Sequence, residues 1–112
     1  ADKSLNENVV KAANELGLND KLHKGMLTTM DVFGPYIDFE RVLGRIPKNL
    51  DILGEEMEAF GLIHIANSMG RKATAIATVV DSKYSNVVLT IEQRQTSLNN
   101  MIKLALEAII KE

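Results

Sequence analysis

The sequence contains no cysteine, so disulfide bonds and thiolate-ligated metal sites are excluded. It also lacks an excess of either charge, because 13 basic and 15 acidic residues give a formal net charge of -2 at pH 7. This balance offers no electrostatic basis for binding nucleic acid or an acidic membrane. Long hydrophobic runs are missing as well: the longest uncharged run, 59–70, is far shorter than the ~18 residues of a membrane span. Nucleic acids and membranes are therefore not expected as partners.

The composition is that of an ordinary globular protein, with 46% hydrophobic and 25% charged residues. A chain of 112 residues is long enough to bury a core, as one domain or as part of one. The first residue is alanine rather than methionine. We therefore expect either a processed N-terminus or a piece of a longer protein.

The first half of the chain predicts a helix, a strand and a loop. Residues 3–16 carry apolar side chains every three or four positions and precede Gly17, which predicts a helix with a glycine stop. Residues 21–30 (KLHKGMLTTM) predict a strand. Both prolines fall within 32–49, which predicts a loop with one helical turn.

The second half begins with a short strand predicted at 51–57, which runs into a helix at 58–69. Residues 73–80 (ATAIATVV) are the clearest predicted strand, because an uninterrupted apolar stretch is typical of a strand covered on both faces. Thr90 followed by Gln93 is a capping-box pattern that opens a helix to the C-terminus. The apolar stripe expected on that helix comprises Leu98, Met101, Ile102, Ala105 and Ile109. Strands alternating with helices predict an α/β fold, here with about three strands and flanking helices.

Three charged positions interrupt this pattern. Asp81 directly follows the predicted strand, where ligands bind in open α/β sheets, although an aspartate there also begins ordinary turns. Arg94 lies on the apolar stripe of the last helix, so it either meets an anionic partner or extends to solvent. Glu58 shares a predicted helix face with apolar side chains and is expected to point inward, where the hydroxyl groups of a ligand would satisfy it.

Other polar residues carry weaker signals. Glu55 and Glu56 occupy the N-terminal turn of the predicted helix, where negative charge is favourable. His23 and His64 have no further ligand at metal-binding spacing, so both are interpreted as structural and no metal site is expected. The sequence contains no P-loop, no G-x-G-x-x-G and no G-x-S-x-G motif.

Residues 55–81, with their E-M-E motif, and residues 92–109, with their R-Q-T motif, resemble the hexameric, bacterial-type purine nucleoside phosphorylases. EEMEAFGLIHIANSMGRKATAIATVVD (55–81) is similar to the E-M-E helix and the following strand of that family. EQRQTSLNNMIKLALEAI (92–109) is similar to the family's final helix. The 13-residue interval from Asp81 to Arg94 equals the family's spacing between its catalytic aspartate and arginine. Uridine phosphorylases and thioether-nucleoside hydrolases share the E-M-E element but lack this R-Q-T helix.

The resemblance implies part of a nucleoside-phosphorylase-like sheet and a set of substrate-binding residues. Glu58 would accept hydrogen bonds from the ribose hydroxyl groups, and Met57 would lie against the sugar. Glu56 would belong to the same ribose-binding wall, and Phe33 would pack on the base.

The resemblance also implies a reaction. Asp81 would be the general acid that protonates the purine at N7, with Arg94 assisting, while inorganic phosphate attacks the ribose. Such proton transfer typically contributes roughly 10²–10⁴-fold in rate. A carboxyl group that holds a proton near neutral pH needs burial that raises its pKa. Phosphate is a co-substrate, and no cofactor is expected.

The chain departs from the family pattern at several positions. Val80 stands where the family has a serine before the acid, and Glu55 stands where it has a small apolar residue. DSKY (81–84) replaces D-H-x-R, and the loop between Phe33 and Glu56 is longer. Phe33 is therefore the least firmly anchored of the expected site residues.

The family's N-terminal half, with its glycine- and arginine-rich phosphate site, has no counterpart in the sequence. Residues 1–112 are therefore interpreted as the C-terminal portion of a single nucleoside phosphorylase domain, which we expect to be inactive alone. The resemblance further implies a cytoplasmic homo-oligomer, a hexamer in the family, that uses purine nucleosides and phosphate in purine salvage. Two alternatives remain open. One is a non-catalytic remnant that acts as an interaction or oligomerisation module, and the other is a related nucleoside hydrolase or uridine phosphorylase.

Overall fold

The computed structural model describes all residues, 1–112, as two compact units. The first unit combines both ends of the sequence, Ala1–Leu22 and Thr74–Glu112. The second unit is the stretch between them, His23–Ala73.

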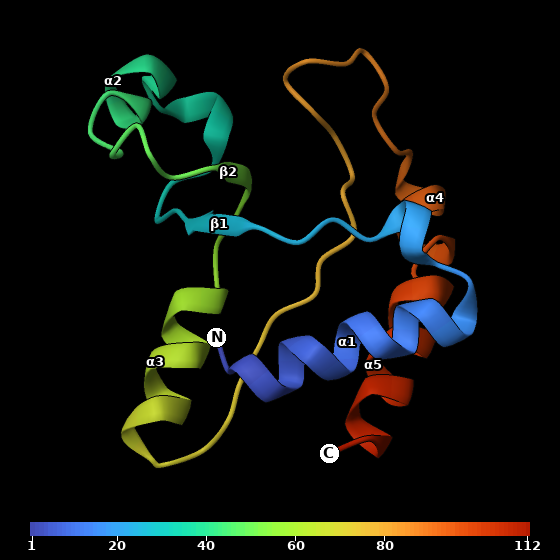
Figure 1. Cartoon of the computed structure of the whole chain (residues 1–112). Coiled ribbons are helices and arrows are strands. Elements are labelled where there is room, and N and C mark those ends of the chain that lie inside the picture. Colours follow the sequence, from blue (N-terminus) through green and yellow to red (C-terminus); the bar gives the residue numbers. More distant parts are fainter. The chain divides into compact units, whose positions relative to one another are not determined.

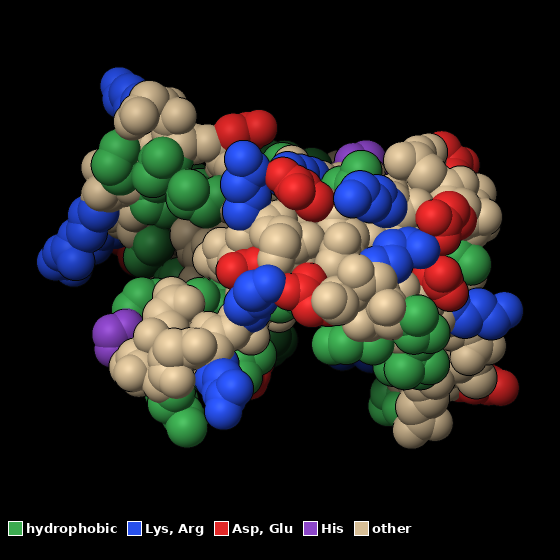
Figure 2. Space-filling view, turned by 60° about the horizontal axis from the view of Figure 1, so that its bottom comes forward, with side chains coloured by type: hydrophobic (Ala, Val, Ile, Leu, Met, Phe, Trp, Pro, Cys, Tyr) green, Lys and Arg blue, Asp and Glu red, His purple; other side chains and the backbone are tan.

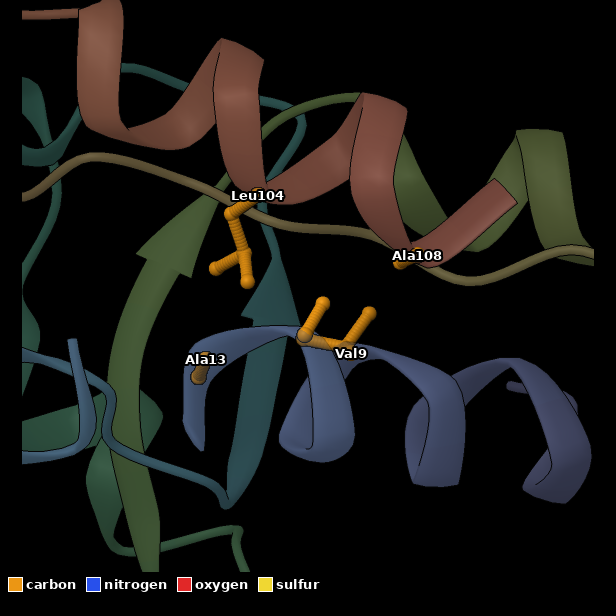
Figure 3. Close-up of a cluster of buried hydrophobic side chains, with 5 residues drawn as sticks. Val9, Ala13, Leu104 and Ala108 are labelled. Atoms are coloured by element: carbon orange, nitrogen blue, oxygen red, sulfur yellow. The ribbon is translucent and has the colours of Figure 1, made fainter. Parts of the chain in front are cut away.

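Two helices that pack against each other form the first unit, α1 (Lys3–Leu16) and α5 (Asn99–Ile110) (Figure 1). In Figure 3, Leu104 and Ala108 of α5 point toward Val9 and Ala13 of α1. The complete buried core comprises Val9, Ala12, Ala13, Leu104 and Ala108. Because most of these side chains are small, the two helix backbones can approach closely.

Local chemistry defines the ends of α1, and the helix predicted at 3–16 is confirmed. The Asp2 side chain accepts a hydrogen bond of 3.0 Å from the Leu5 N–H at the N-terminus. At the other end, Gly17 adopts the left-handed conformation with φ 68° and donates its N–H to the last turn. Glycine is favoured there because it has no Cβ to clash in that conformation.

Polar contacts join the far end of α5 to α1. The buried Asn8 amide donates to the Glu112 carboxylate over 2.9 Å. Lys111 Nζ lies 2.5 Å from Glu15 Oε2 and 3.2 Å from Glu107 Oε1. The hydrogen bond to Glu15 raises the pKa of Lys111; burial opposes this, and the hydrogen bond to Glu107 adds to the rise.

Residues 73–80 do not form the predicted strand, and Figure 1 shows no arrow there. Their side chains nevertheless alternate as in a strand, with Thr74, Ile76, Thr78 and Val80 half-buried and the intervening residues exposed. Ile76 packs on the core of the first unit, and Thr78 donates a hydrogen bond to the sulfur of Met101. A strand also needs hydrogen bonds to a neighbouring strand, and the two-stranded sheet of this chain does not include 73–80. The sheet therefore has two strands rather than about three.

The single C-terminal helix predicted from Thr90 is interrupted. The capping box is confirmed, since Gln93 N–H donates to Thr90 Oγ1 and Thr90 N–H donates to Gln93 Oε1. However, α4 (Ile91–Thr96) ends before α5 begins. The Thr96 hydroxyl donates to the carbonyl of Glu92 over 3.0 Å, a contact that tends to bend helices.

The buried stripe of α5 is also offset from the predicted one. Leu104 and Ala108 are buried, whereas Ile102, Ala105 and Ile109 are exposed. This helix carries apolar side chains on more than one face, so periodicity alone does not identify the face that contacts α1.

The second unit contains a parallel pair of strands, β1 (Met26–Thr29) and β2 (Ile52–Glu56), in which Thr29 is the partner of Glu56. Both predicted strands are confirmed, with shorter bounds. The connection holds a 3-10 turn (Gly34–Tyr36) and the short helix α2 (Phe39–Leu43), as the predicted loop with a helical turn requires. A crossover of this kind lets the second strand run parallel to the first.

Helix α3 (Ala59–Ser68) follows β2 after a turn of two residues. The face expected to be buried is exposed, with Leu62 at 58%, Ile65 at 59% and Met69 at 68%. Figure 2 likewise shows hydrophobic side chains (green) among charged ones on the molecular surface. None of the helices is both long and apolar enough to cross a membrane.

Candidate functional site

The four expected substrate-binding residues gather at one edge of the second unit. Parallel strands place their carboxyl ends on the same side of a sheet, and this is where α/β proteins bind ligands. Phe33 comes shortly after β1, while Glu56, Met57 and Glu58 form the end of β2 and the turn into α3. The backbone pairing continues past the strands, since the Met30 N–H donates to the Glu56 carbonyl over 2.8 Å.

Glu56 is the most firmly held of these residues. Its Oε2 accepts hydrogen bonds from the N–H groups of Glu58 at 2.6 Å and Ala59 at 2.5 Å. Its Oε1 accepts a hydrogen bond from the Thr29 hydroxyl. The carboxylate thus satisfies N–H groups at the start of α3, which have no partner within the helix.

The protonation of Glu56 reflects these contacts. Partial burial raises the pKa of Glu56, but the hydrogen bonds from Thr29, Ala59 and Glu58 outweigh this effect, and its pKa lies below the ordinary value. Hydrogen bonds to a carboxylate stabilise its charged form. Glu56 is therefore an ionised, oriented group.

Glu58 lies differently from the sequence expectation. It is the N-cap residue of α3, its side chain makes no capping hydrogen bond, and it is exposed rather than directed inward. Sequence periodicity placed it in the helix, but the helix begins one residue later, at Ala59. Met57 beside it is 44% exposed. Both side chains are accessible to a ligand.

Phe33 is exposed at 58%, and its ring centroid lies 6.2 Å from that of Tyr36. The next residue, Gly34, lies against the end of β2, since a Cβ there would be 2.5 Å from Glu55 Oε1. The loop that carries Phe33 therefore runs beside the segment that carries the three glutamates.

Asp81 and Arg94 come together in the first unit. Arg94 Nη2 lies 4.0 Å from Asp81 Oδ2, with the side chains 46% and 55% exposed. Arg94 Nε donates to the Leu89 carbonyl over 3.2 Å, and the Leu89 N–H donates to the Val80 carbonyl over 2.9 Å. The bond between Leu89 and Val80 closes the base of the loop that follows Asp81. The bond from Arg94 to Leu89 holds the guanidinium group beside that base. Arg94 is thus exposed, as one of the two sequence interpretations expected.

No group of three His, Asp or Glu side chains has an arrangement that could hold a metal ion. His64 stacks on Phe60, with ring centroids 5.8 Å apart. Sequence reasoning missed Thr29, which contacts both Glu56 and the N–H of Phe60. A threonine at the end of a strand carries no distinctive signal, because its role depends on the facing strand.

Comparison with known proteins defines the class. A sequence model of the phosphorylase superfamily matches residues 1–111, and the chain belongs to this superfamily. The family resemblance and the α/β fold class predicted from the sequence are thereby confirmed.

One curated relative shows the similarity at the level of an individual protein. The DeoD-type purine nucleoside phosphorylase of Yersinia enterocolitica (serotype O:8, biotype 1B) is 38% identical to this chain over 110 residues. The match covers 98% of this chain and 44% of the relative, so the chain spans less than half the length of that protein. No solved structure matches the chain.

Proposed function

We propose that this chain supplies the nucleoside-binding and base-protonating residues of a purine nucleoside phosphorylase. The observation that carries the proposal is the pairing of Asp81 with Arg94 across 4.0 Å, in a chain 38% identical to a purine nucleoside phosphorylase. The accessible Glu58 and Met57 at the carboxyl edge of the parallel strands support it.

The sugar would be bound by the turn between β2 and α3. The Glu58 carboxylate offers hydrogen-bond acceptors for the two ribose hydroxyl groups, and Met57 offers an apolar contact for the ring. Phe33 would stack on the purine. Glu56 would complete the wall behind the sugar.

In the proposed reaction, the bond between the purine N9 and the ribose C1′ breaks, and its electron pair passes to the base. Asp81 donates a proton to N7 of the departing base, and a phosphate oxygen forms the new bond to C1′. The products are the free purine and ribose 1-phosphate, and Asp81 regains a proton from solvent. Inorganic phosphate is a co-substrate, and no cofactor is needed.

Arg94 would act on the ligand rather than through a tight ion pair. Exposed ion pairs contribute little, and the separation of 4.0 Å leaves both groups available. When a nucleoside binds, the guanidinium group would approach the base or the acid. We further propose that the whole protein is a cytoplasmic homo-oligomer, as the family resemblance implies.

The test is the phosphorolysis of inosine and adenosine by the whole protein, of which this chain is a portion, with Asp81→Asn. We expect the rate to fall roughly 10²–10⁴-fold, because asparagine cannot donate the proton. Nucleoside binding, followed by calorimetric titration, should persist. Asp20→Asn is the matched control, since Asp20 is an exposed aspartate of the same unit. Unchanged turnover of Asp81→Asn would refute the assignment of the acid.

A second candidate function is a non-catalytic interaction module. The exposed apolar face of α3 favours it, because a helix that is apolar on several faces is usually covered. Under this alternative, neither inosine nor adenosine would bind, and Asp81→Asn would have no effect on any property except local charge.

A further inference from the structure

We propose that Thr29 is a positioning residue for sugar recognition: its hydroxyl group holds Glu56 and the first turn of α3, so that Met57 and Glu58 are presented in a fixed geometry. This role rests on the proposed function, because it concerns the same ribose-binding turn. Thr29 itself would not touch the substrate.

The contacts of Thr29 link three segments of the second unit. The residue ends β1, where its cross-strand partner is Glu56 at the end of β2. Its Oγ1 donates a hydrogen bond to Glu56 Oε1 and accepts one of 3.0 Å from the Phe60 N–H. One hydroxyl group therefore joins the end of β1 to the end of β2 and to the start of α3.

The two side chains together complete the N-terminus of α3. Glu56 accepts the N–H groups of Glu58 and Ala59, and Thr29 accepts the next one, that of Phe60. These donors have no partner inside the helix, so each contact stabilises the start of the helix at this position. The N-cap residue, Glu58, makes no capping hydrogen bond with its own side chain.

This arrangement explains why Glu58 is free while its backbone is fixed. A Ser, Thr, Asp or Asn at the N-cap normally uses its side chain on the helix N–H groups. Here the side chains of Thr29 and Glu56 accept the N–H groups at the start of α3 instead. The Glu58 carboxylate therefore makes no capping hydrogen bond and is exposed. A ligand-binding side chain whose backbone is already fixed loses less conformational freedom when the ligand binds.

Thr29→Val tests the proposal, because valine keeps the shape of threonine but has no hydroxyl group. The hydrogen exchange of the Phe60 amide should accelerate about fivefold to tenfold, as expected for the loss of one hydrogen bond. The pKa of Glu56, followed by carbon NMR of its carboxyl group, should rise because a stabilising donor is removed. The whole protein carrying Thr29→Val should show a KM for purine nucleosides about fivefold to tenfold higher, with kcat nearly unchanged.

Two variants serve as controls. Thr29→Ser keeps the hydroxyl group and should restore the exchange rate, the Glu56 pKa and KM. Thr28→Val removes a neighbouring hydroxyl group whose bond, 3.4 Å to the Gly54 carbonyl, does not involve the turn. It should leave all three quantities unchanged.

The outcomes separate this inference from the proposed function. Unchanged exchange and Glu56 pKa in Thr29→Val, or equal effects of Thr28→Val, would overturn the positioning role. An unchanged KM together with a disturbed turn would also overturn it, because Thr29 would then be merely structural. If the whole, unaltered protein binds no purine nucleoside, the proposed function fails, and so does the sugar-related part of this inference. The exchange and pKa measurements would still decide whether Thr29 anchors the turn.

Discussion

At the scale of single residues, three neighbouring glutamates have three different surroundings. Glu56 accepts three hydrogen bonds, Glu55 lies beside Gly34, and Glu58 is exposed without a capping contact. The neighbouring carboxylates therefore differ in role: Glu56 stabilises the start of α3, and Glu58 remains accessible.

The contacts of Glu56 predict an acid-sensitive turn. Because its pKa is lowered in the folded chain, its stabilising contribution is present above the ordinary carboxyl value of ~4.3 and is lost as the pH falls through the folded pKa. We expect amide exchange at the start of α3 to accelerate across this acidic range. Glu56→Gln should remove most of this pH dependence, because glutamine does not titrate.

Glu55→Gln is the matched control for this experiment, since Glu55 is an exposed neighbour of Glu56. It should keep the acid dependence of the parent protein. A pH dependence that survives in Glu56→Gln would show that another group controls the turn.

The sequence located this turn but not the role of each glutamate in it. The spacing of apolar residues assigned Glu58 to the helix and to its buried face, whereas the helix begins at Ala59 and Glu58 is exposed. Which carboxylate reaches the backbone depends on the path of the turn and on the hydroxyl group of Thr29 from another strand. Neither is visible in local periodicity.

At the scale of helices and strands, signals between neighbouring residues were more reliable than features that depend on distant parts of the chain. The left-handed Gly17 and the capping box of Thr90 and Gln93 involve residues at most a few positions apart, and both were predicted. Residues 73–80 have the composition and the side-chain alternation of a strand, but a strand also requires a neighbour, which composition cannot supply.

The capping box predicts how strongly α4 depends on Thr90. Thr90→Ala removes one of the two reciprocal hydrogen bonds and should destabilise this short helix by about 1 kcal/mol. Amide exchange at Gln93 and Arg94 should then accelerate, while α5 stays unchanged. Under the proposed function, phosphorolysis by the whole protein should slow as well, because Arg94 is held less firmly.

Thr90→Ser preserves the hydroxyl group and should behave as the parent protein in this exchange measurement. Equal protection of Arg94 in Thr90→Ala would mean that its contact with the Leu89 carbonyl, rather than the cap, holds α4 in place.

At the scale of the whole molecule, many apolar side chains are exposed. In addition to the exposed face of α3 in the second unit, the first unit exposes Val79 at 75%, in a segment that has the alternation of a strand but no strand partner. Exposed apolar patches and unpaired strand edges are typical sites of association.

We therefore expect this 112-residue chain, studied by itself, to self-associate. Light scattering after size exclusion should give a mass above 12.4 kDa that increases with concentration. Val79→Lys should reduce the association, because a charge on the exposed side of the segment opposes pairing. Leu43→Lys is the control, at an exposed leucine of α2. A constant monomeric mass at all concentrations would contradict the expectation.

The first unit is assembled from the two ends of the sequence, and this affects how it forms during synthesis. Asn8 is hydrogen-bonded to Glu112, which lies 104 positions later in the sequence. Leu104 and Ala108 cover the apolar face of α1. At the usual ribosomal speed of roughly 5–20 residues per second, α1 emerges about 5–20 s before its partner helix. During that interval its apolar face is open to chaperones and to other nascent chains.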